Sequence, residues 1–210
     1  GLFRTDLNAQ PKHAGFSQFI IDLKNTPGVT VRPIEDLTGR KHFNEVVFEN
    51  ALVSDDALLG TENDGWRQVG SELAIERSGP ERFLSCAVLF VELLKVLEQG
   101  DDQSAKREIG SILANLVTLR SMSLSVSGKL AQGDDVSLQA VIVKDLGAEF
   151  EQTLPGIVQK IVGIEPNLSD DAEPLAQVLA LLTMLAPSFS LRGGTVEILR
   201  GIIAKRLGIS

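Results

Sequence analysis

The residues best suited to bind a ligand lie in one turn near the C-terminus, Gly193-Gly194-Thr195. Glycines let the backbone approach a ligand closely, and a helix N-terminus presents free N–H groups to an anion. The helix that this turn opens is amphipathic, because its apolar side chains form one stripe away from its charges. The stripe consists of Ile198, Leu199, Ile202 and Ile203. Taken as a bare pattern, the turn is equally compatible with a plain helix start in which Thr195 is an N-cap.

Two acidic–basic pairs, Glu76-Arg77 and Glu81-Arg82, form a second group of charged residues. From the residues alone they favour a solvated helix face with local ion pairs, each worth about 0.3–0.5 kcal/mol. No metal site is expected, because His13 and His42 are far apart in sequence and have no Cys or clustered carboxylates beside them.

The first sixty residues are typical of β structure. Strands are expected over 16–23, 29–34 and 42–48, separated by turns at Thr26-Pro27-Gly28 and Thr38-Gly39. The mostly apolar 16–23 run predicts a strand buried on both faces. Three short strands with turns between them predict an antiparallel sheet or barrel.

From residue 66 the apolar spacing is helical. A first run over 66–98 is interrupted at Gly79-Pro80, because a proline removes one helical hydrogen bond. After a polar break at 99–102, helices are expected over 104–132 with Ser104 as N-cap, from 138 to about 154 with an apolar continuation to 164, and over 175–185. The predicted fold class is α+β: a partial antiparallel β-domain (1–60) followed by an up-down four-helix bundle (61–210).

Composition fits an ordinary globular protein, with 43% hydrophobic and 23% charged residues. The net charge of −8 argues against a general nucleic-acid binder. The single cysteine, Cys86, lies in an apolar run, so we expect a buried inert thiol, no internal disulfide and a cytoplasmic location. No apolar stretch reaches the ~18 residues of a membrane span, so none is expected. The chain starts at Gly1 without an initiator Met, and we expect it to be a fragment of a longer protein.

Several stretches, in the right order and over nearly the whole chain, resemble the acyl-CoA dehydrogenases, which are flavoenzymes. The run from Gly193 to Arg206 resembles the C-terminal GGT-x-E-I helix of that family, and Leu73-Ala74-Ile75-Glu76-Arg77 resembles the first long helix of its helical domain. Residues 4–6, 13–17, 27–33 and 43–48 resemble its middle β-domain, and residues 58–60 and 65–66 the crossing between the two domains.

The resemblance implies an α,β-desaturation of an acyl-CoA thioester. In this family a glutamate removes the α-proton, hydride passes from the β-carbon to FAD, and an electron-transfer flavoprotein follows downstream. One branch places the base immediately before the Gly-Thr of the C-terminal motif, where this chain has Gly193. A second branch uses the Glu of a Glu-Arg pair on the long helix, which makes Glu76 the candidate base and Arg77 a candidate for contacts near the CoA.

The family also suggests cofactor contacts and partners. Gly194, Thr195 and Glu197 match its C-terminal FAD positions, and Lys106 stands where an Arg of an adjoining subunit reaches FAD. A Lys can neutralise a phosphate but lacks the bidentate fork of Arg. The family's Gln-x-x-Gly-Gly stretch, expected between 158 and 166, has no counterpart. A homodimer or homotetramer is expected from the family.

Two alternatives to the dehydrogenase reading follow from the same residues. Gly193, Lys106 and the missing Gln-x-x-Gly-Gly stretch favour a non-catalytic scaffold subunit of a hetero-oligomeric acyl-CoA dehydrogenase. Glu76 and the intact Gly-Gly-Thr-x-Glu run favour the enzyme. The other alternative is an acyl-CoA oxidase, which differs in letting oxygen reach the flavin.

Overall fold

The computed structural model describes residues 1–97 and 102–209. The chain divides into two compact units, residues 1–73 and 74–210. Strands are confined to the first unit and long helices dominate the second, which confirms the predicted α+β class. The predicted domain boundary after residue 60 stays a prediction, and the polar break predicted at 99–102 lies almost entirely outside the described residues.

The first unit contains two small antiparallel sheets. β1 (Leu2–Arg4), β2 (Phe16–Phe19) and β5 (Leu58–Leu59) form one, with β2 in the middle. β3 (Val29–Ile34) and β4 (Phe43–Phe48) form a hairpin in which Val29 pairs with Phe48. The hairpin leaves part of its apolar surface exposed, at Val31, Ile34, Phe43, Val46 and Phe48.

The strand predicted over 16–23 is shorter than expected. It ends at Phe19, and the next residue, Ile20, is 68% exposed, so the run is not buried on both faces. Asp22 explains the end of the strand, because its carboxylate accepts the backbone N–H groups of Lys24 and Asn25. Such an Asx turn satisfies the backbone locally and competes with the sheet.

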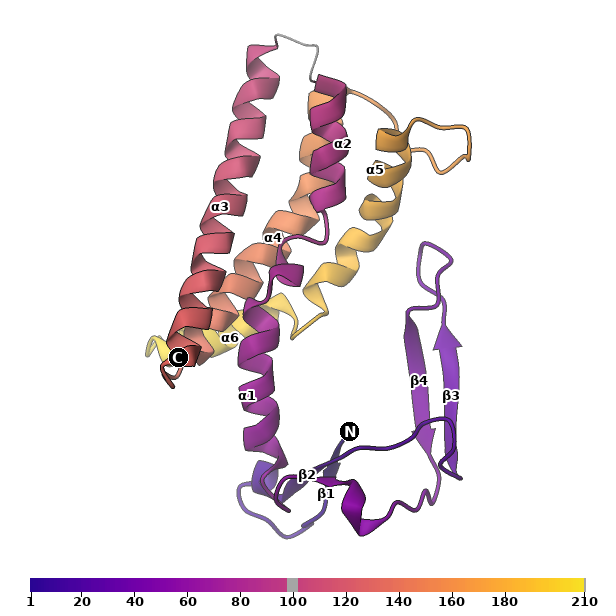
Figure 1. Ribbon diagram of the computed structural model, residues 1–210, viewed down its shortest axis with the longest axis vertical. Coiled ribbons are helices and arrows are strands. Elements are labelled where there is room, and N and C mark those ends of the chain that lie inside the picture. Colours follow the sequence, from indigo (N-terminus) through magenta and orange to yellow (C-terminus); the bar gives the residue numbers. More distant parts are fainter. Residues whose placement is uncertain (98–101, 210) are drawn as a thin grey trace. The chain divides into compact units, whose positions relative to one another are not determined.

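The second unit is a bundle around one central helix (Figure 1). Its elements are the end of α1 (Gly65–Ser78), then α2 (Ala87–Leu97), α3 (Gln103–Ala131), α4 (Ser137–Val162), α5 (Pro174–Leu185) and α6 (Val196–Arg206). α4 contacts α2, α3, α5 and α6, and α3 runs alongside it. The core between them is apolar and includes Leu89, Leu93, Ile112, Leu119, Leu154, Val158 and Leu179.

Helix boundaries depend on capping side chains and prolines, which the spacing of apolar residues does not reveal. The run predicted over 66–98 is two separate helices, because α1 ends at Ser78 and Gly79-Pro80 begins a short 3-10 turn (Pro80–Arg82). The predicted N-cap Ser104 is wrong. Asp102 is the cap of α3, and its carboxylate accepts the Ser104 N–H at 2.7 Å.

Pro155 stands inside α4 without breaking it. A proline has no N–H for the carbonyl four residues earlier, here that of Glu151. The Cys86 thiol donates to that carbonyl instead, at 3.6 Å. Burial raises the pKa of Cys86 to about 12, so the thiol keeps the proton that this hydrogen bond needs. The expectation of a buried thiol is confirmed.

Within the described part of the chain, one helix, α3, is long and apolar enough to cross a membrane by length and composition alone. The expectation that no stretch meets this measure is therefore wrong. Three α3 residues spaced by seven, Ile112, Leu119 and Val126, are buried in the second unit. Core helices of soluble proteins pass the same test, so the expected absence of a membrane partner stays a prediction.

We expect Cys86 to be almost inert toward thiol reagents in the native protein. At pH 8 a thiol with a pKa of about 12 carries so little thiolate that labelling with dithionitrobenzoate should be at least about a hundredfold slower than in urea. Cys86→Ala should lower the free energy of unfolding by about 1–3 kcal/mol, because it leaves the Glu151 carbonyl without a donor. Fast labelling of the native protein would contradict this assignment.

Candidate functional site

The end of α1 and the turn before α6 come together in the second unit. Arg77 Nε donates to the Gly193 carbonyl at 2.8 Å, across 116 residues of sequence. Gly193 and Gly194 have φ of +69° and +108°, a region that favours glycine. A Cβ at Gly193 would lie 3.5 Å from Glu76 Oε1 and 3.4 Å from Arg77 Cγ. The structure therefore brings Glu76, Arg77, Gly193 and Gly194 into one cluster.

Glu76 has a partner that the sequence does not single out. Its Oε1 pairs with Nη2 of Arg82, and its backbone carbonyl accepts a hydrogen bond from Arg82 Nε at 3.0 Å. Arg82 is only 7% exposed, so the idea of a solvated helix face fails for this residue. Arg82 could have been found from the Gly79-Pro80 break, which lets the chain turn back toward α1.

Two buried charges on α4 hold the segment 189–192 that leads into this turn. Lys144 is 1% exposed, and its Nζ donates to the Phe189 carbonyl at 3.0 Å. Glu151 is fully buried, and its Oε2 lies 2.8 Å from Nη2 of Arg192. Oε1 of Glu151 accepts the backbone N–H of Ser85 at 2.6 Å. Lys144 and Glu151 are seven residues apart and thus share one helix face.

Burial shifts the pKa values of Lys144 and Glu151 in the directions that favour the neutral side chains. Desolvation, together with the positive charges of Arg82 and Arg192, lowers the pKa of Lys144 to about 8. Desolvation raises the pKa of Glu151, and the guanidinium of Arg192 opposes it. The Cε of Lys144 lies 3.8 Å from a Cβ built on Gly193, so this shifted amine is beside the same turn.

Sequence reasoning missed Lys144 and Glu151. The available signal is that Lys144 and Glu151 are seven residues apart and in line with the apolar Val158, on a face of the helix expected to be core.

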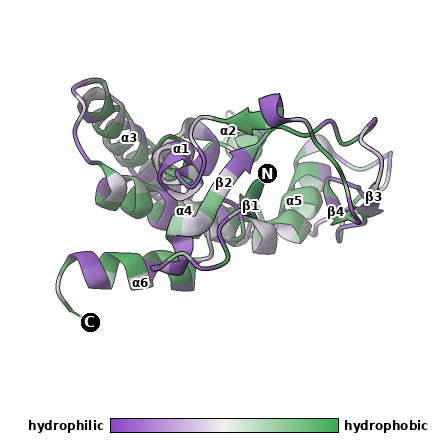
Figure 2. Ribbon diagram, turned by 90° about the horizontal axis from the view of Figure 1, so that it is seen from below, coloured by the Kyte–Doolittle hydropathy of each residue, from purple (hydrophilic) through white to green (hydrophobic). Residues whose placement is uncertain are grey.

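The start of α6 places Thr195 and Glu197 close together. Thr195 occupies the N-cap position, but its hydroxyl does not cap the helix. The backbone N–H of Glu197 itself and the Thr195 hydroxyl lower the pKa of the Glu197 carboxyl. Of the stripe expected on this helix, Leu199 is buried and Ile198 is 60% exposed, and hydrophilic and hydrophobic segments alternate along α6 (Figure 2).

Lys106 lies apart from this cluster. It is an exposed residue near the start of α3, at the opposite end of the bundle from α6 (Figure 1). The structure thus brings five of the six predicted site residues together at the α1 end and the α6 start, and leaves Lys106 outside.

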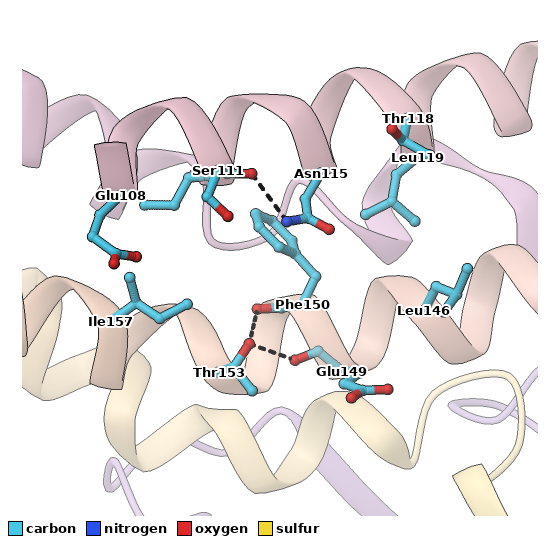
Figure 3. A pocket seen from close by; sticks show the side chains of 11 residues that line it. Glu108, Ser111, Asn115, Thr118, Leu119, Leu146, Glu149, Phe150, Thr153 and Ile157 are labelled. Carbon is cyan, nitrogen blue, oxygen red and sulfur yellow. Dashed lines mark hydrogen bonds between the residues drawn. The ribbon is translucent and has the colours of Figure 1, made fainter. Parts of the chain in front are cut away.

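A separate cavity of about 300 Å³ lies between α3 and α4 (Figure 3). Two of its polar side chains bond to carbonyls of their own helices: Asn115 donates to the Ser111 carbonyl, and Thr153 to the Glu149 carbonyl. Among the described residues that line it, the charged ones are Glu108 and Glu149. Since an acidic lining repels phosphates, this cavity does not suit a nucleotide.

The described part of the chain contains no candidate metal site beside this cluster. Within it, no group of three or more His, Cys, Asp or Glu could hold a metal ion. His13 lies against Trp66, with ring centroids 5.7 Å apart.

Comparison with known families gives the cluster its context. The family model "Acyl-CoA dehydrogenase, C-terminal domain" matches residues 63–208. The chain belongs to the acyl-CoA dehydrogenase family. The match includes every residue of the cluster, and Thr195 and Glu197 beside it. The suspected family resemblance is therefore confirmed.

Individual relatives agree with this membership. Acyl-CoA dehydrogenase FadE34 of Mycobacterium tuberculosis is 31% identical over 98% of this chain, which spans 28% of FadE34. An acyl-CoA dehydrogenase structure from Geobacillus kaustophilus superposes with a TM-score of 0.81 at 21% identity, over 98% of this chain and 56% of the other. The ChsE4–ChsE5 complex from M. tuberculosis gives a TM-score of 0.74 at 21% identity, over 96% of this chain and 55% of the other. These two structures support the fold alone.

The chain spans from 28% to 53% of the length of the curated acyl-CoA dehydrogenases that it matches along nearly all of its own length. FAD is the cofactor that this family implies. The α6 start fits part of that molecule: a hydroxyl, a carboxylate and backbone N–H groups suit its neutral hydroxyls. The Glu197 carboxylate repels a diphosphate, so that part of FAD does not fit here.

We expect the stability difference between the wild type and Lys144→Met to depend on pH. The pKa of Lys144 falls from about 10.5 unfolded to about 8 folded, so the unfolded state holds more protons between these values. Wild-type stability should therefore rise relative to the variant from pH 8 to 10.5, by up to about 3 kcal/mol. Urea unfolding at several pH values measures this gap, with exposed Lys129→Met as the control. A gap that stays constant with pH would contradict the assignment.

Proposed function

We propose that this chain carries the catalytic base of an acyl-CoA dehydrogenase, and that Glu76 removes the α-proton of an acyl-CoA thioester. The observation that carries the proposal is the closeness of the Glu76 carboxylate to the place that a side chain on Gly193 would take. In one branch of the family the base stands at the position of Gly193, and in another at that of Glu76. Because a Cβ at Gly193 would lie 3.5 Å from Glu76 Oε1, carboxylates from either position reach the same place.

The surroundings of Glu76 suit proton transfer. Arg82 holds Oε1, while among the described residues no donor is bonded to Oε2, which leaves that oxygen to accept the proton. The Glu76 side chain is 43% exposed, so a substrate can reach it. When FAD is bound, it accepts the hydride that leaves the β-carbon. The thioester thus loses a proton to Glu76 and a hydride to the cofactor, and becomes α,β-unsaturated.

The remaining site residues take supporting roles in this proposal. Arg77 is half-buried beside Glu76 and brings a positive charge that suits an anionic group of CoA. Gly194, Thr195 and Glu197 would hold the hydroxyl-bearing part of FAD. Lys106, near the start of α3, would serve a cofactor bound in a neighbouring subunit, as in a homodimer or homotetramer. An electron-transfer flavoprotein would reoxidise the flavin.

A scaffold subunit is the second candidate. It is supported by Gly193 and Lys106, which depart from the family pattern, and by the missing Gln-x-x-Gly-Gly stretch. An acyl-CoA oxidase would differ in consuming oxygen without an electron carrier.

The visible absorption spectrum of the purified full-length protein separates the enzyme from the scaffold. We expect a flavin band that bleaches when a panel of acyl-CoAs is added anaerobically, and the thioesters that bleach it identify the substrate class. A protein that purifies colourless and stays so with added FAD is the scaffold.

Glu76→Gln should reduce the rate of flavin bleaching by about 10²–10⁴-fold, because the amide cannot accept the α-proton. Stopped-flow absorbance at the flavin band measures this rate. The matched control is Glu72→Gln, one turn earlier on α1, where the carboxylate accepts a hydrogen bond from Gln18. Equal rates in Glu76→Gln and the wild type would remove Glu76 from the chemistry.

A further inference from the structure

Arg82 makes two hydrogen bonds to one residue, Glu76. Its Nε donates to the Glu76 backbone carbonyl at 3.0 Å, and its Nη2 donates to the Glu76 carboxylate at Oε1. The backbone carbonyl lies in the last turn of α1, where carbonyls have no partner within the helix. Arg82 therefore satisfies a carbonyl at the end of α1 and holds the carboxylate with the same guanidinium.

The contact depends on the break between α1 and α2. Residues six apart in a continuous helix are separated by about 9 Å along the axis and lie on different faces. Gly79 takes an extended conformation, with φ of −65° and ψ of 156°, and Pro80 starts the 3-10 turn that ends at Arg82. The chain thereby folds back, and Arg82 reaches the residue that it follows by six positions.

A glycine on α4 fixes this turn from the other side. A Cβ at Gly147 would lie 2.3 Å from the Arg82 carbonyl oxygen, too close for any side chain. Gly147 therefore lets α4 pack directly against the backbone of Arg82. With its side chain 8% exposed and its backbone against α4, Arg82 has little freedom to move.

Several charged residues lie near Arg82, but both side-chain hydrogen bonds that Arg82 donates go to Glu76. Glu81 Oε1 lies 3.9 Å from Arg82 Nε, which is too long for a hydrogen bond, and the Glu81 side chain is 53% exposed. Lys144 and Arg192 are cations near Arg82, since the positive charges of Arg82 and Arg192 both lower the pKa of Lys144. The buried guanidinium of Arg82 is stabilised because the carboxylate of Glu76 faces it.

We propose that Arg82 is a positioning residue for the base. It holds Oε1 of Glu76 beside Gly193 and leaves Oε2 to take the proton. This inference rests on the proposed function, in which Glu76 is the base, but the coupling between Arg82 and Glu76 can be measured without any activity.

The first experiment is a double-mutant cycle on unfolding, with Arg82→Gln, Glu76→Gln and the double variant in the full-length protein. We expect the shift in urea midpoint caused by Arg82→Gln to be clearly smaller when Glu76 is already Gln, because the contact is lost only once. Additive shifts would show that the two side chains do not interact and would overturn the proposal.

The second experiment uses the kinetics of the FAD-loaded full-length protein. Arg82→Gln should lower kcat by about 10²-fold and leave KM nearly unchanged, because a base displaced by about 1 Å reacts poorly while binding persists. Arg82→Lys keeps the charge but lacks the fork that bonds carbonyl and carboxylate together, so it should be similarly slow. Full activity of Arg82→Lys would show that charge alone suffices and would overturn positioning.

Two further variants separate positioning from stability. Gly147→Ala should push the Arg82 turn away from α4 and lower kcat although both charges remain. Ile112→Val, in the core and away from the cluster, should lower the urea midpoint with kcat unchanged. If none of the acyl-CoAs bleaches the flavin of the wild type, the proposed function fails. The double-mutant cycle alone then decides whether Arg82 holds Glu76.

Discussion

The site depends on two buried charges of α4, because a charge placed in an apolar core must find a partner or lose its charge. Lys144 finds the carbonyl of Phe189, and Glu151 finds the guanidinium of Arg192. Both partners belong to the short segment before α6, so the energetic demand of the two charges fixes the path of that segment. The glycine turn beyond it then meets the end of α1 in a defined place.

The same principle explains why two prolines have opposite effects. At Pro80 the freed carbonyl is that of Glu76, and its new donor, Arg82, reaches it only because the chain turns back, whereas at Pro155 the thiol of Cys86 replaces the missing N–H and α4 continues. Apolar periodicity treats both prolines alike. The two cases differ in where the replacement donor lies: on the chain that has turned back at Pro80, and in a segment distant in sequence at Pro155.

Much of the fold could be predicted from the sequence, because helix periodicity and the Gly-Gly-Thr run are local signals. The order of elements and the family followed from them. The strand over 16–23 was overextended because Asp22 ends it through its side chain, and the cap of α3 was misplaced by two residues for a similar reason. Of the site, the sequence indicated Glu76 and the glycine turn. It held only indirect signals for Arg82, Lys144 and Glu151, namely the Gly79-Pro80 break and a spacing of seven residues, because the roles of these residues depend on burial and on partners that the spacing does not identify.

The hydrogen bond from Arg77 to Gly193 has a consequence for folding. It joins residues 116 positions apart, and closing a loop of that length costs conformational entropy. Contacts of such sequence separation raise the contact order, which slows folding. The end of α1 and the start of α6 therefore meet across most of the second unit. The distance between them reports whether that unit is assembled.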